Sequence, residues 1–354
     1  MMLMNAGLES YGIDSLRARL AELGQPKFRA EQVLSWVYAK GATSYGQMTN
    51  VPKDLRATLE QEAPLHVPRI VDKQVSRDET RKYVLELADG ELVEAVGIPS
   101  RDRSDNGSPQ RLTVCFSTQV GCPMGCTFCA TGTQGFTRNL GPGEMALQIV
   151  AVSRDFDARV SNVVAMGQGE PFLNYDNLIE GLRIINDPKL VGIGARHITV
   201  STCGIVEGIR RLAREPEQFT LAVSLHAAVQ ETRDALMPVS ASTPLVQLRA
   251  ELVDYFEASG RRFSLEYLMI DGANSDQEHL DALVRFCNGL HAHVNLLAVN
   301  KVQGSPLEPC SPAHMKSWET ALQTSGTPAS IRDSRGKDID AACGQLKNNV
   351  RPAG

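Results

Sequence analysis

From residue 112 onward, short apolar runs rich in Val, Leu and Ile alternate with longer stretches of helical periodicity. The strand-like runs cover residues 112–118, 160–166, 197–202, 219–225, 263–270 and 293–299. The helix-like stretches lie near residues 143–154, 175–186, 205–214, 244–258, 276–288 and 312–323. These six repeats predict an α/β fold with parallel strands and right-handed crossovers, either an open sheet or a full or partial TIM-type barrel. In either arrangement, functional residues are expected at the carboxyl ends of the strands.

The chain before these repeats predicts two smaller units. Residues 13–63 have the apolar spacing of helices, and residues 70–99 form short strand-like runs with Asp89-Gly90 as a hairpin turn signal. The polar stretch at residues 101–110 predicts a loop. We expect a helical accessory domain at 1–66, a β extension and loop at 67–111, the barrel with a C-terminal cysteine segment at 112–347, and a tail at 348–354.

The overall charge is mildly acidic. The 36 Lys and Arg residues against 41 Asp and Glu residues give a net charge of −5, so a nucleic-acid partner would have to bind a local basic surface. No stretch approaches 18 consecutive apolar residues, and the first residues lack the basic start and apolar core of a secretory signal. We therefore expect a cytoplasmic protein that does not cross a membrane.

Three of the eight cysteines, Cys122, Cys126 and Cys129, crowd into one segment directly after the first strand of the series. A structural zinc site usually has four ligands, and no histidine stands near these thiols. A [4Fe–4S] cluster normally takes four cysteines, so three would leave one iron free to bind a further ligand. The spacing favours such a cluster. The alternatives are three cysteines that are close by chance, and a zinc site that a distant residue completes.

A glycine-rich turn with one carboxylate follows the second strand. The string GQGEP at residues 167–171 contains Gly169 and Glu170. Glycine permits close approach of a ligand to the backbone. Glycine-rich strand ends are common, so this turn alone is weak evidence for a binding site. Its position after the cysteine segment strengthens that evidence.

Together, the cysteine spacing and this turn resemble the radical S-adenosylmethionine (SAM) superfamily. In that superfamily the open iron binds the amino and carboxylate groups of SAM, and a Gly-Glu-Pro motif receives the amino group. The resemblance implies one [4Fe–4S] cluster held by Cys122, Cys126 and Cys129, and a 5′-deoxyadenosyl radical made from SAM. It also implies a partial (β/α)6 barrel of the TIM type.

A closer resemblance extends from about residue 28 to residue 347. It rests on strings at residues 93–99, 115–122, 134–140, 224–227, 295–300 and 335–346. These strings resemble the RlmN family, whose members methylate C2 of an adenosine in 23S ribosomal RNA and in transfer RNA. The resemblance implies a radical SAM methyltransferase that acts on these RNAs and consumes two SAM molecules per turnover. It also implies an electron donor such as flavodoxin or ferredoxin, and we expect a monomer.

The resemblance assigns roles to three residues outside the cluster motif. Cys343 matches the cysteine that accepts a methyl group from SAM, because the electrophilic C2 carbon of adenine cannot attack SAM itself. The S-methylcysteine then links protein to RNA through a methylene group. Glu94 matches the proton acceptor, and Cys115 matches the cysteine that releases the adduct by forming a disulfide with Cys343. From the residues alone, a lone cysteine such as Cys115 is usually a small buried side chain, and a glutamate such as Glu94 usually belongs to the solvated face of its strand.

Further positions match the SAM-binding residues of the family: Gly169, Glu170, Ser201, Ser224, Leu225, His226 and Asn300. Several of them stand at the ends of predicted strands, where a barrel binds its cofactor. Taken alone, His226 would be interpreted as a buried imidazole with satisfied hydrogen bonds. The cysteines at 203, 287 and 310 match no catalytic element and are interpreted as ordinary thiols.

Two other functions remain open on the sequence. One is an RNA-binding factor without turnover, in which the three clustered cysteines are structural. The other is a different radical SAM enzyme, such as a methyltransferase that acts at adenine C8 or an enzyme that modifies proteins. The candidate phosphate contacts for RNA are Arg138, Arg332, Arg335, Lys337 and Lys347.

Overall fold

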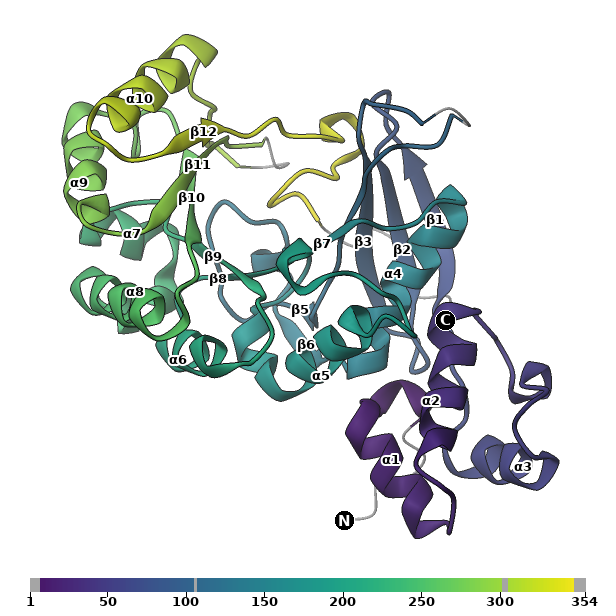
Figure 1. The fold of residues 1–354 in the computed structure, drawn as a ribbon. Helices are drawn as coiled ribbons and strands as arrows, with labels where there is room; N and C mark the ends of the chain where they lie inside the picture. The colour runs from purple at the N-terminus through teal and green to yellow at the C-terminus, as the bar shows by residue number, and fades with distance from the viewer. Residues whose placement is uncertain (1–6, 105–106, 301–304, 347–354) are drawn as a thin grey trace.

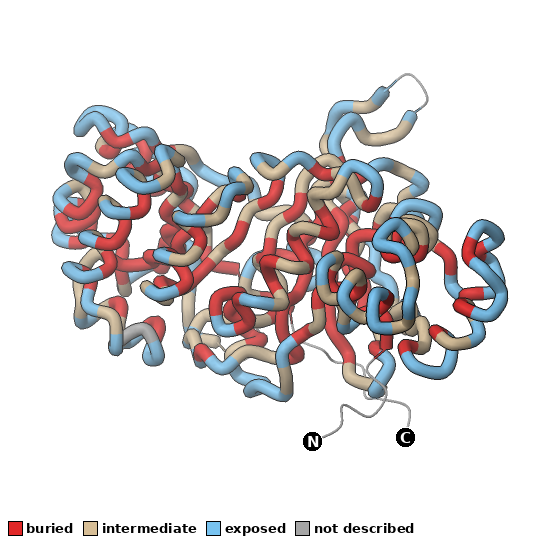
Figure 2. The backbone as a smooth tube through the Cα atoms, turned by 60° about the horizontal axis from the view of Figure 1, so that its bottom comes forward, coloured by how far each residue is buried: buried red, intermediate tan, exposed pale blue. Residues whose placement is uncertain are grey.

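A single curved sheet organises the molecule. The structure is a computed structural model that describes residues 7–104, 107–300 and 305–346. Its ten-stranded sheet has the order β1-β2-β3-β4-β7-β8-β9-β10-β11-β12, and helices cover its outer side (Figure 1). Figure 2 shows that the buried residues follow the sheet and the helix faces against it. This arrangement confirms the predicted α/β fold.

The parallel part of the sheet is the predicted partial barrel, with one strand beyond the six expected. Its strands are β4 (Leu112–Cys115), β7 (Asn162–Ala165), β8 (Ile198–Thr202), β9 (Thr220–Ser224), β10 (Phe263–Met269), β11 (Ala292–Ala298) and β12 (Ala329–Ile331). The crossover helices are α4 (Pro142–Phe156), α5 (Tyr175–Asn186), α6 (Val206–Arg214), α8 (Leu245–Ser259), α9 (Gln277–Cys287) and α10 (Pro312–Thr324). Among the described strands, β1 and β12 end the sheet without pairing with each other, so the barrel is open.

Three antiparallel strands extend this sheet. They are β1 (Arg69–Val75), β2 (Arg81–Glu86) and β3 (Leu92–Pro99). The predicted turn between β2 and β3 is confirmed, with Gly90 at φ 82°, a left-handed conformation that glycine adopts at little cost. In the last antiparallel pair Val96 lies opposite Cys115, so the extension and the barrel share one continuous ladder.

The two faces of β3 have different coverings. On the outer face Gly97 lets α4 approach closely, because an added Cβ would collide with the Phe156 ring. On the inner face Val96 and Cys115 contact Ala341 and Leu346 of the C-terminal segment. Both faces are therefore buried, and the inner face is sealed by residues far away in the sequence.

The C-terminal segment, residues 332–346, returns from β12 across the open side of the barrel (Figure 1). Hydrogen bonds to the turn between β1 and β2 anchor it. Among them, Arg335 Nε donates to Asp78 Oδ2 at 2.7 Å, and Ser76 Oγ donates to Asp338 Oδ1 at 2.5 Å. The segment is thereby held over the inner face of the sheet.

The N-terminal helices form the small lobe at the lower right of Figure 1. They are α1 (Ile13–Glu22), α2 (Phe28–Leu34) and α3 (Lys53–Glu62), as the helical spacing predicts. Leu16, Leu20 and Leu59 are almost fully buried in a core that is continuous with that of the barrel. Each such leucine contributes about 1.5–3 kcal/mol.

Several short elements were not predicted. They are β12, the helix α7 (Gln230–Leu236) and the hairpin of β5 (Gln119–Gly121) and β6 (Phe136–Asn139). Each spans between three and seven residues, too few for a periodic pattern to be recognised. Within the described parts of the chain, no helix has the length and apolar character needed to cross a membrane.

Candidate active site

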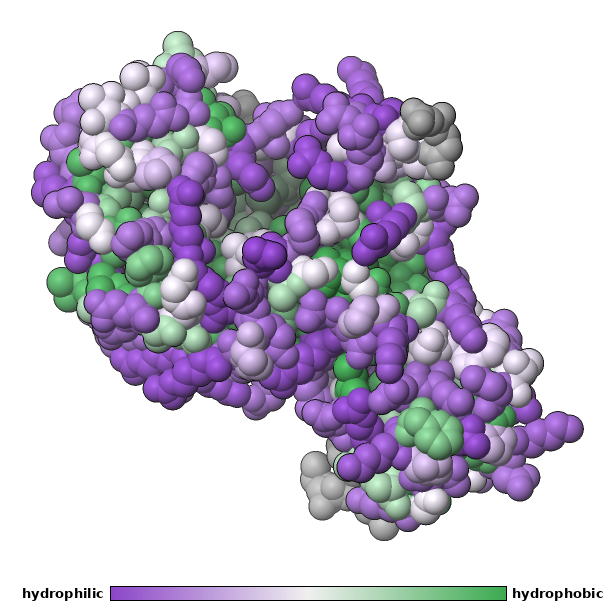
Figure 3. Space-filling view, viewed as in Figure 1, coloured by the Kyte–Doolittle hydropathy of each residue, from purple (hydrophilic) through white to green (hydrophobic). Residues whose placement is uncertain are grey.

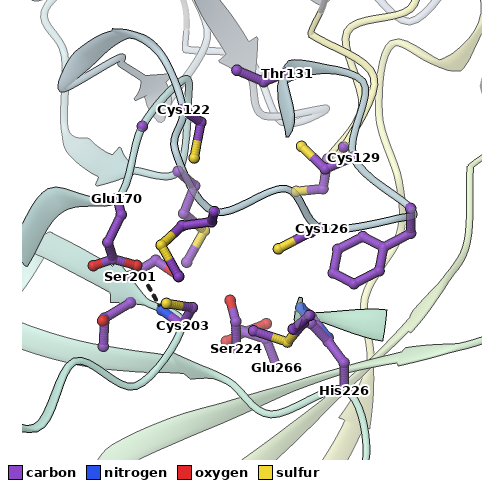
Figure 4. Close-up of a pocket in the computed structure, with 18 of the residues that line it drawn as sticks. Cys122, Cys126, Cys129, Thr131, Glu170, Ser201, Cys203, Ser224, His226 and Glu266 are labelled. Carbon is purple, nitrogen blue, oxygen red and sulfur yellow. Dashed lines mark hydrogen bonds between the residues drawn. The ribbon is translucent and has the colours of Figure 1, made fainter. Parts of the chain in front are cut away.

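One pocket opens at the carboxyl ends of the parallel strands, where the barrel pattern predicts it. Of the predicted site residues, it is lined by Cys122, Cys126, Cys129, Gly169, Glu170, Ser201, Ser224, His226 and Cys343. Figure 4 shows the three clustered cysteines on one loop above the strand ends, with Glu170, Ser201 and Ser224 below them. The structure thus brings together residues from five separate stretches of the chain.

The cysteine loop connects β5 and β6 and is held at both sides. Thr127 N donates to Leu236 O at the end of α7, at 3.0 Å. On the other side Ala130 N donates to Gly344 O at 2.7 Å. The loop is therefore fixed directly against the turn that carries Cys343.

The donor set fits an iron–sulfur cluster. All three thiols are free and partly exposed to the pocket. Burial raises the pKa of Cys122 to about 11 and also raises that of Cys126, so metal binding has to displace their protons. Among the described residues no three His, Cys, Asp or Glu side chains converge tightly enough to hold a single metal ion. The fit therefore rests on three soft thiol donors that share one open pocket.

Glu170 is fixed by backbone amides. Phe172 N donates to its Oε1 at 3.0 Å and Cys203 N donates to its Oε2 at 2.7 Å, the latter drawn in Figure 4. Burial raises the pKa of this carboxyl group, and the amide donors oppose that rise. Beside it, Gly169 has φ 104°, and an added Cβ would lie 2.8 Å from Thr118 Oγ1. The turn therefore needs glycine at this position and presents a carboxylate of fixed orientation.

His226 is held as a neutral imidazole. Its Nδ1 accepts a hydrogen bond from Leu268 N at 3.1 Å, which assigns the proton to Nε2. Burial, with a further contribution from the Arg233 charge, lowers its pKa to about 3. The ring packs edge-on against Phe128, with centroids 4.8 Å apart. His226 is therefore a buried imidazole whose Nδ1 has a hydrogen-bond partner, as one interpretation of the sequence expects. It also lines the pocket.

Two predicted SAM-binding residues are not among the side chains that line the pocket. Leu225 is fully buried in the hydrophobic core, and only its backbone lies near the site, with its N–H bonded to Glu266 O at 3.0 Å. Asn300 donates from Nδ2 to Cys343 O at 3.1 Å. In this structure Asn300 therefore orients the C-terminal cysteine.

Cys343 lies between the pocket and the inner face of the sheet. It lines the pocket and is reached by solvent through it, while the surrounding protein raises the pKa of its thiol to about 11. The charge of Glu266 adds to this rise and that of Arg332 opposes it. The thiol is therefore protonated at neutral pH and accessible from the pocket side.

Cys115 lies behind Cys343, at the end of β4. It is buried against Ala341 and Leu346 and does not line the pocket. Burial raises the pKa of its thiol, and the nearby Cys343 raises it further. Both cysteines are free thiols in the structure.

Glu94 lies on the same inner face as Cys115. Side chains two residues apart share a face of a strand, and Val96 is the partner of Cys115. Glu94 is 1% exposed, so the alternative of a solvated strand face is wrong. Burial raises its pKa to about 7. A carboxylate that titrates near neutrality suits a proton acceptor.

Glu266 and Cys203 also line the pocket. The sequence alone does not identify Glu266 as a site residue, and it indicates an ordinary thiol at Cys203. Glu266 Oε1 accepts hydrogen bonds from Ser264 Oγ and Asn295 Nδ2, each at 2.8 Å. A charged residue inside the apolar run at 263–270 was the available signal. Cys203 follows Thr202, the last residue of β8, and its backbone amide holds Glu170.

The basic candidates for RNA contact differ in their surroundings. Arg138 is already paired with Asp89 at 2.7 Å and with Glu144 at 2.9 Å. Arg335 is paired with Asp78, whereas Arg332 and Lys337 are exposed. Lys347 and the predicted tail lie outside the described residues. The ion pairs leave Arg138 and Arg335 poorly suited to bind phosphate.

Comparisons with known proteins agree with this geometry. Residues 8–65 match the family "Ribosomal RNA large subunit methyltransferase N-terminal domain", and residues 116–286 match the "Radical SAM superfamily". A protein of Syntrophomonas wolfei named "Probable dual-specificity RNA methyltransferase RlmN" is 39% identical over 96% of each chain. A protein of the same name from Akkermansia muciniphila is 42% identical over 94% of this chain and 93% of its own. The chain belongs to the RlmN family.

A solved structure extends the similarity to the fold. A radical SAM methyltransferase from Sphaerobacter thermophilus superposes with a TM-score of 0.89 and is 41% identical, over 97% of this chain and 99% of its own. Membership of a radical SAM family implies SAM and a [4Fe–4S] cluster as cofactors of this RlmN-family protein. The residues that fit the cluster are the three thiols of the cysteine loop.

Removing one of these thiols tests the cluster site. Because even substitutions outside the ligand shell cost about 10- to 100-fold in metal affinity, Cys126→Ala should lower the iron and sulfide bound after anaerobic reconstitution by at least about tenfold. Cys310→Ala is the matched control, since this buried thiol does not line the pocket. Equal iron content in both variants would contradict the assignment.

Proposed function

We propose that this protein is a radical SAM methyltransferase that methylates C2 of a specific adenosine in 23S ribosomal RNA and in transfer RNA. The main support is the position of Cys343. Its thiol lines the pocket that also contains Cys122, Cys126 and Cys129, and its segment packs on Cys115. A methyl carrier has to reach both a cofactor and a resolving thiol, and this placement suits both contacts.

In the proposed reaction the chain supplies the methyl carrier. The Cys343 thiol loses its proton and takes a methyl group from one SAM molecule by displacement, which gives S-methylcysteine. Cys122, Cys126 and Cys129 would hold a [4Fe–4S] cluster, which would supply the electron for reductive cleavage of a second SAM molecule to a 5′-deoxyadenosyl radical. One hydrogen of the S-methyl group is then removed and ends in 5′-deoxyadenosine, and the remaining methylene carbon bonds to adenine C2. The unpaired electron left on the base passes to the oxidised form of the external electron donor.

Two buried residues complete the proposed reaction. Glu94 accepts the proton from C2, which requires the carboxylate form. The thiolate of Cys115 then attacks the sulfur of Cys343, and a disulfide forms between the two cysteines. The methylene carbon leaves with the electron pair of the broken sulfur–carbon bond and takes up a proton, which gives the methyl group of the product. An external reductant restores both thiols. These two steps depend on the pairing of β3 with β4, which brings Glu94 and Cys115 onto one face of the sheet.

We assign SAM binding to the pocket residues Gly169, Glu170, Ser201, Ser224 and His226, with Leu225 contributing backbone only. The fixed carboxylate of Glu170 suits an amino group, and the serine hydroxyls suit the carboxylate and ribose of the cofactor. Asn300 supports the site through its bond to Cys343 O. Each turnover consumes two SAM molecules in this proposal.

The RNA has to present an unstacked adenine. Extruding a base costs a few kcal/mol, and less in a looped single strand than in a duplex. Figure 3 shows a largely hydrophilic face that is hollowed between the parts over α10 and over the β extension. The exposed Arg332 and Lys337 are the basic residues that we assign to phosphate contact.

These assignments give each part of the chain a proposed role. We assign residues 1–66 to an accessory domain, 67–111 to the β extension that carries Glu94, 112–347 to the catalytic barrel, and 348–354 to a tail. We further propose that the enzyme acts as a cytoplasmic monomer and receives electrons from a donor such as flavodoxin or ferredoxin.

Nucleoside mass spectrometry tests this function. A 23S ribosomal RNA fragment and a transfer RNA are incubated anaerobically with reconstituted protein, SAM and a reductant. The proposal predicts 2-methyladenosine. A product of 8-methyladenosine would assign the protein to C8 methylation instead. SAM cleavage without any modified adenosine would contradict the RNA substrate, and absence of SAM cleavage would favour an RNA-binding factor without turnover.

A further inference from the structure

A buried lysine lies beside the proposed base. Lys82, on β2, is 5% exposed, although lysines are rarely buried unless they are paired. Its register partner on β3 is Val96, so its side chain shares the inner face with Glu94 and Cys115. The proposed function gives Lys82 no role.

The Lys82 ammonium group connects two parts of the proposed site. Its Nζ lies 3.8 Å from Glu94 Oε1 and donates to Asp340 O at 3.4 Å. Asp340 lies three residues before Cys343 in the C-terminal segment. One cation therefore contacts both the proposed base and the backbone of the segment that carries the methyl group.

The surroundings of Glu94 offer little else that would stabilise its negative charge. Its Oε2 is buried and has no hydrogen-bond partner. The other charged groups that act on it are Asp72 on β1 and Asp340 on the C-terminal segment, and both oppose its ionisation. Lys82 is the cation that favours its ionised form, and the thiol of Cys115 shares this face, with the thiol of Cys343 close to it. A carboxylate buried without such a partner would take up a proton.

We propose that Lys82 is a positioning residue that keeps Glu94 ionised as the proton acceptor and ties it to the segment that carries Cys343. The proposal rests on the proposed function, because it needs Glu94 to act as a base. Lys82 itself transfers no proton. It stabilises the charge that Glu94 needs before the C2 proton leaves.

The sign of the pH effect follows from the charges. Burial raises the pKa of Glu94 to about 7, and Lys82 opposes that rise. Removing the Lys82 charge should raise the pKa of Glu94 further, so that the base is ionised only at higher pH. If the pKa rises by about one unit, the ionised fraction at pH values below it falls about tenfold.

The test measures decay of the protein–RNA adduct in single turnover as a function of pH. Wild type, Lys82→Met and Lys82→Arg are first loaded with methyl groups on Cys343, and the adduct is separated from free RNA on denaturing gels. Glu94→Gln supplies the profile without the carboxylate. Lys73→Met is the matched control, since Lys73 lies on the neighbouring strand and pairs with Asp155 on α4.

We expect Lys82→Met to shift the acidic limb of the decay profile upward by about one pH unit or more and to slow decay about tenfold at pH 6.5. Lys82→Arg should restore the wild-type midpoint, and Lys73→Met should not move it. An unchanged midpoint in Lys82→Met would overturn the inference.

Two readouts separate this inference from other failures. Methyl loading of Cys343, measured by intact mass, shows that a variant is folded and binds SAM, and it does not require Glu94. If Lys82→Met fails to load, Lys82→Gln replaces it, because its amide can still donate to Asp340 O without carrying a charge. If wild type itself forms no adduct, the proposed function fails. A wild-type adduct with the same midpoint in the uncharged variant contradicts only the role of Lys82.

Discussion

A Cys343→Ala variant is expected to form neither methylated adenosine nor a covalent complex with RNA. The Cys343 thiol is the proposed methyl carrier and the only link between cofactor and base, so its loss removes both the first displacement and the adduct. Product should therefore fall to background, a far larger effect than the roughly 10²- to 10⁴-fold loss typical of removing an acid or base. Nucleoside mass spectrometry and denaturing gels measure the two outcomes.

The control for this variant is its cofactor chemistry. Cys343 is not one of the three proposed cluster ligands, so iron content and reductive SAM cleavage should persist in Cys343→Ala. Cys310→Ala, away from the pocket, should retain normal product formation. Methylated RNA from Cys343→Ala at the wild-type rate would show that the methyl group takes another route.

A Cys115→Ala variant is expected to trap the protein on its RNA. Methyl loading and radical formation use groups in the pocket, which Cys115 does not line, so both should proceed. Resolution should stop, because Cys115, which lies near Cys343, is the residue proposed to release its sulfur. Adduct should accumulate to nearly one RNA per active protein, with less than about one turnover of free product.

Denaturing gels with labelled RNA show the trapped species directly. Cys287→Ala, another buried thiol on α9, serves as the matched control and should release product normally. Multiple turnovers by Cys115→Ala would contradict the two-thiol mechanism. Loss of both adduct and methyl loading would instead indicate that Cys115 is needed for the structure of the segment.

Much of the fold was accessible from the sequence because its determinants are local. The strands and crossover helices of the barrel follow from hydrophobic periodicity, and the cysteine loop follows from spacing within eight residues. Gly169 and Glu170 were located by their place after a strand, and the structure puts both in the pocket. Such features depend on neighbours along the chain.

The remaining features depend on tertiary contacts that a single sequence does not encode locally. That Glu94 and Cys115 share one buried face follows from the register of β3 on β4. That Asn300 bonds to Cys343 O depends on how the C-terminal segment crosses the barrel, and that Leu225 faces the core depends on packing at the end of β9. The sequence gives no indication of a role for Lys82, because only folding places it beside Glu94.

The central claim is that the methyl group on C2 passes through Cys343, and isotope transfer tests it most directly. Protein is loaded on Cys343 with a trideuterated methyl group from labelled SAM, freed of that SAM, and given unlabelled SAM, reductant and RNA for one turnover. The account predicts 2-methyladenosine with two deuterium atoms, because one leaves in hydrogen abstraction and appears in 5′-deoxyadenosine. First-turnover 2-methyladenosine without deuterium would contradict it.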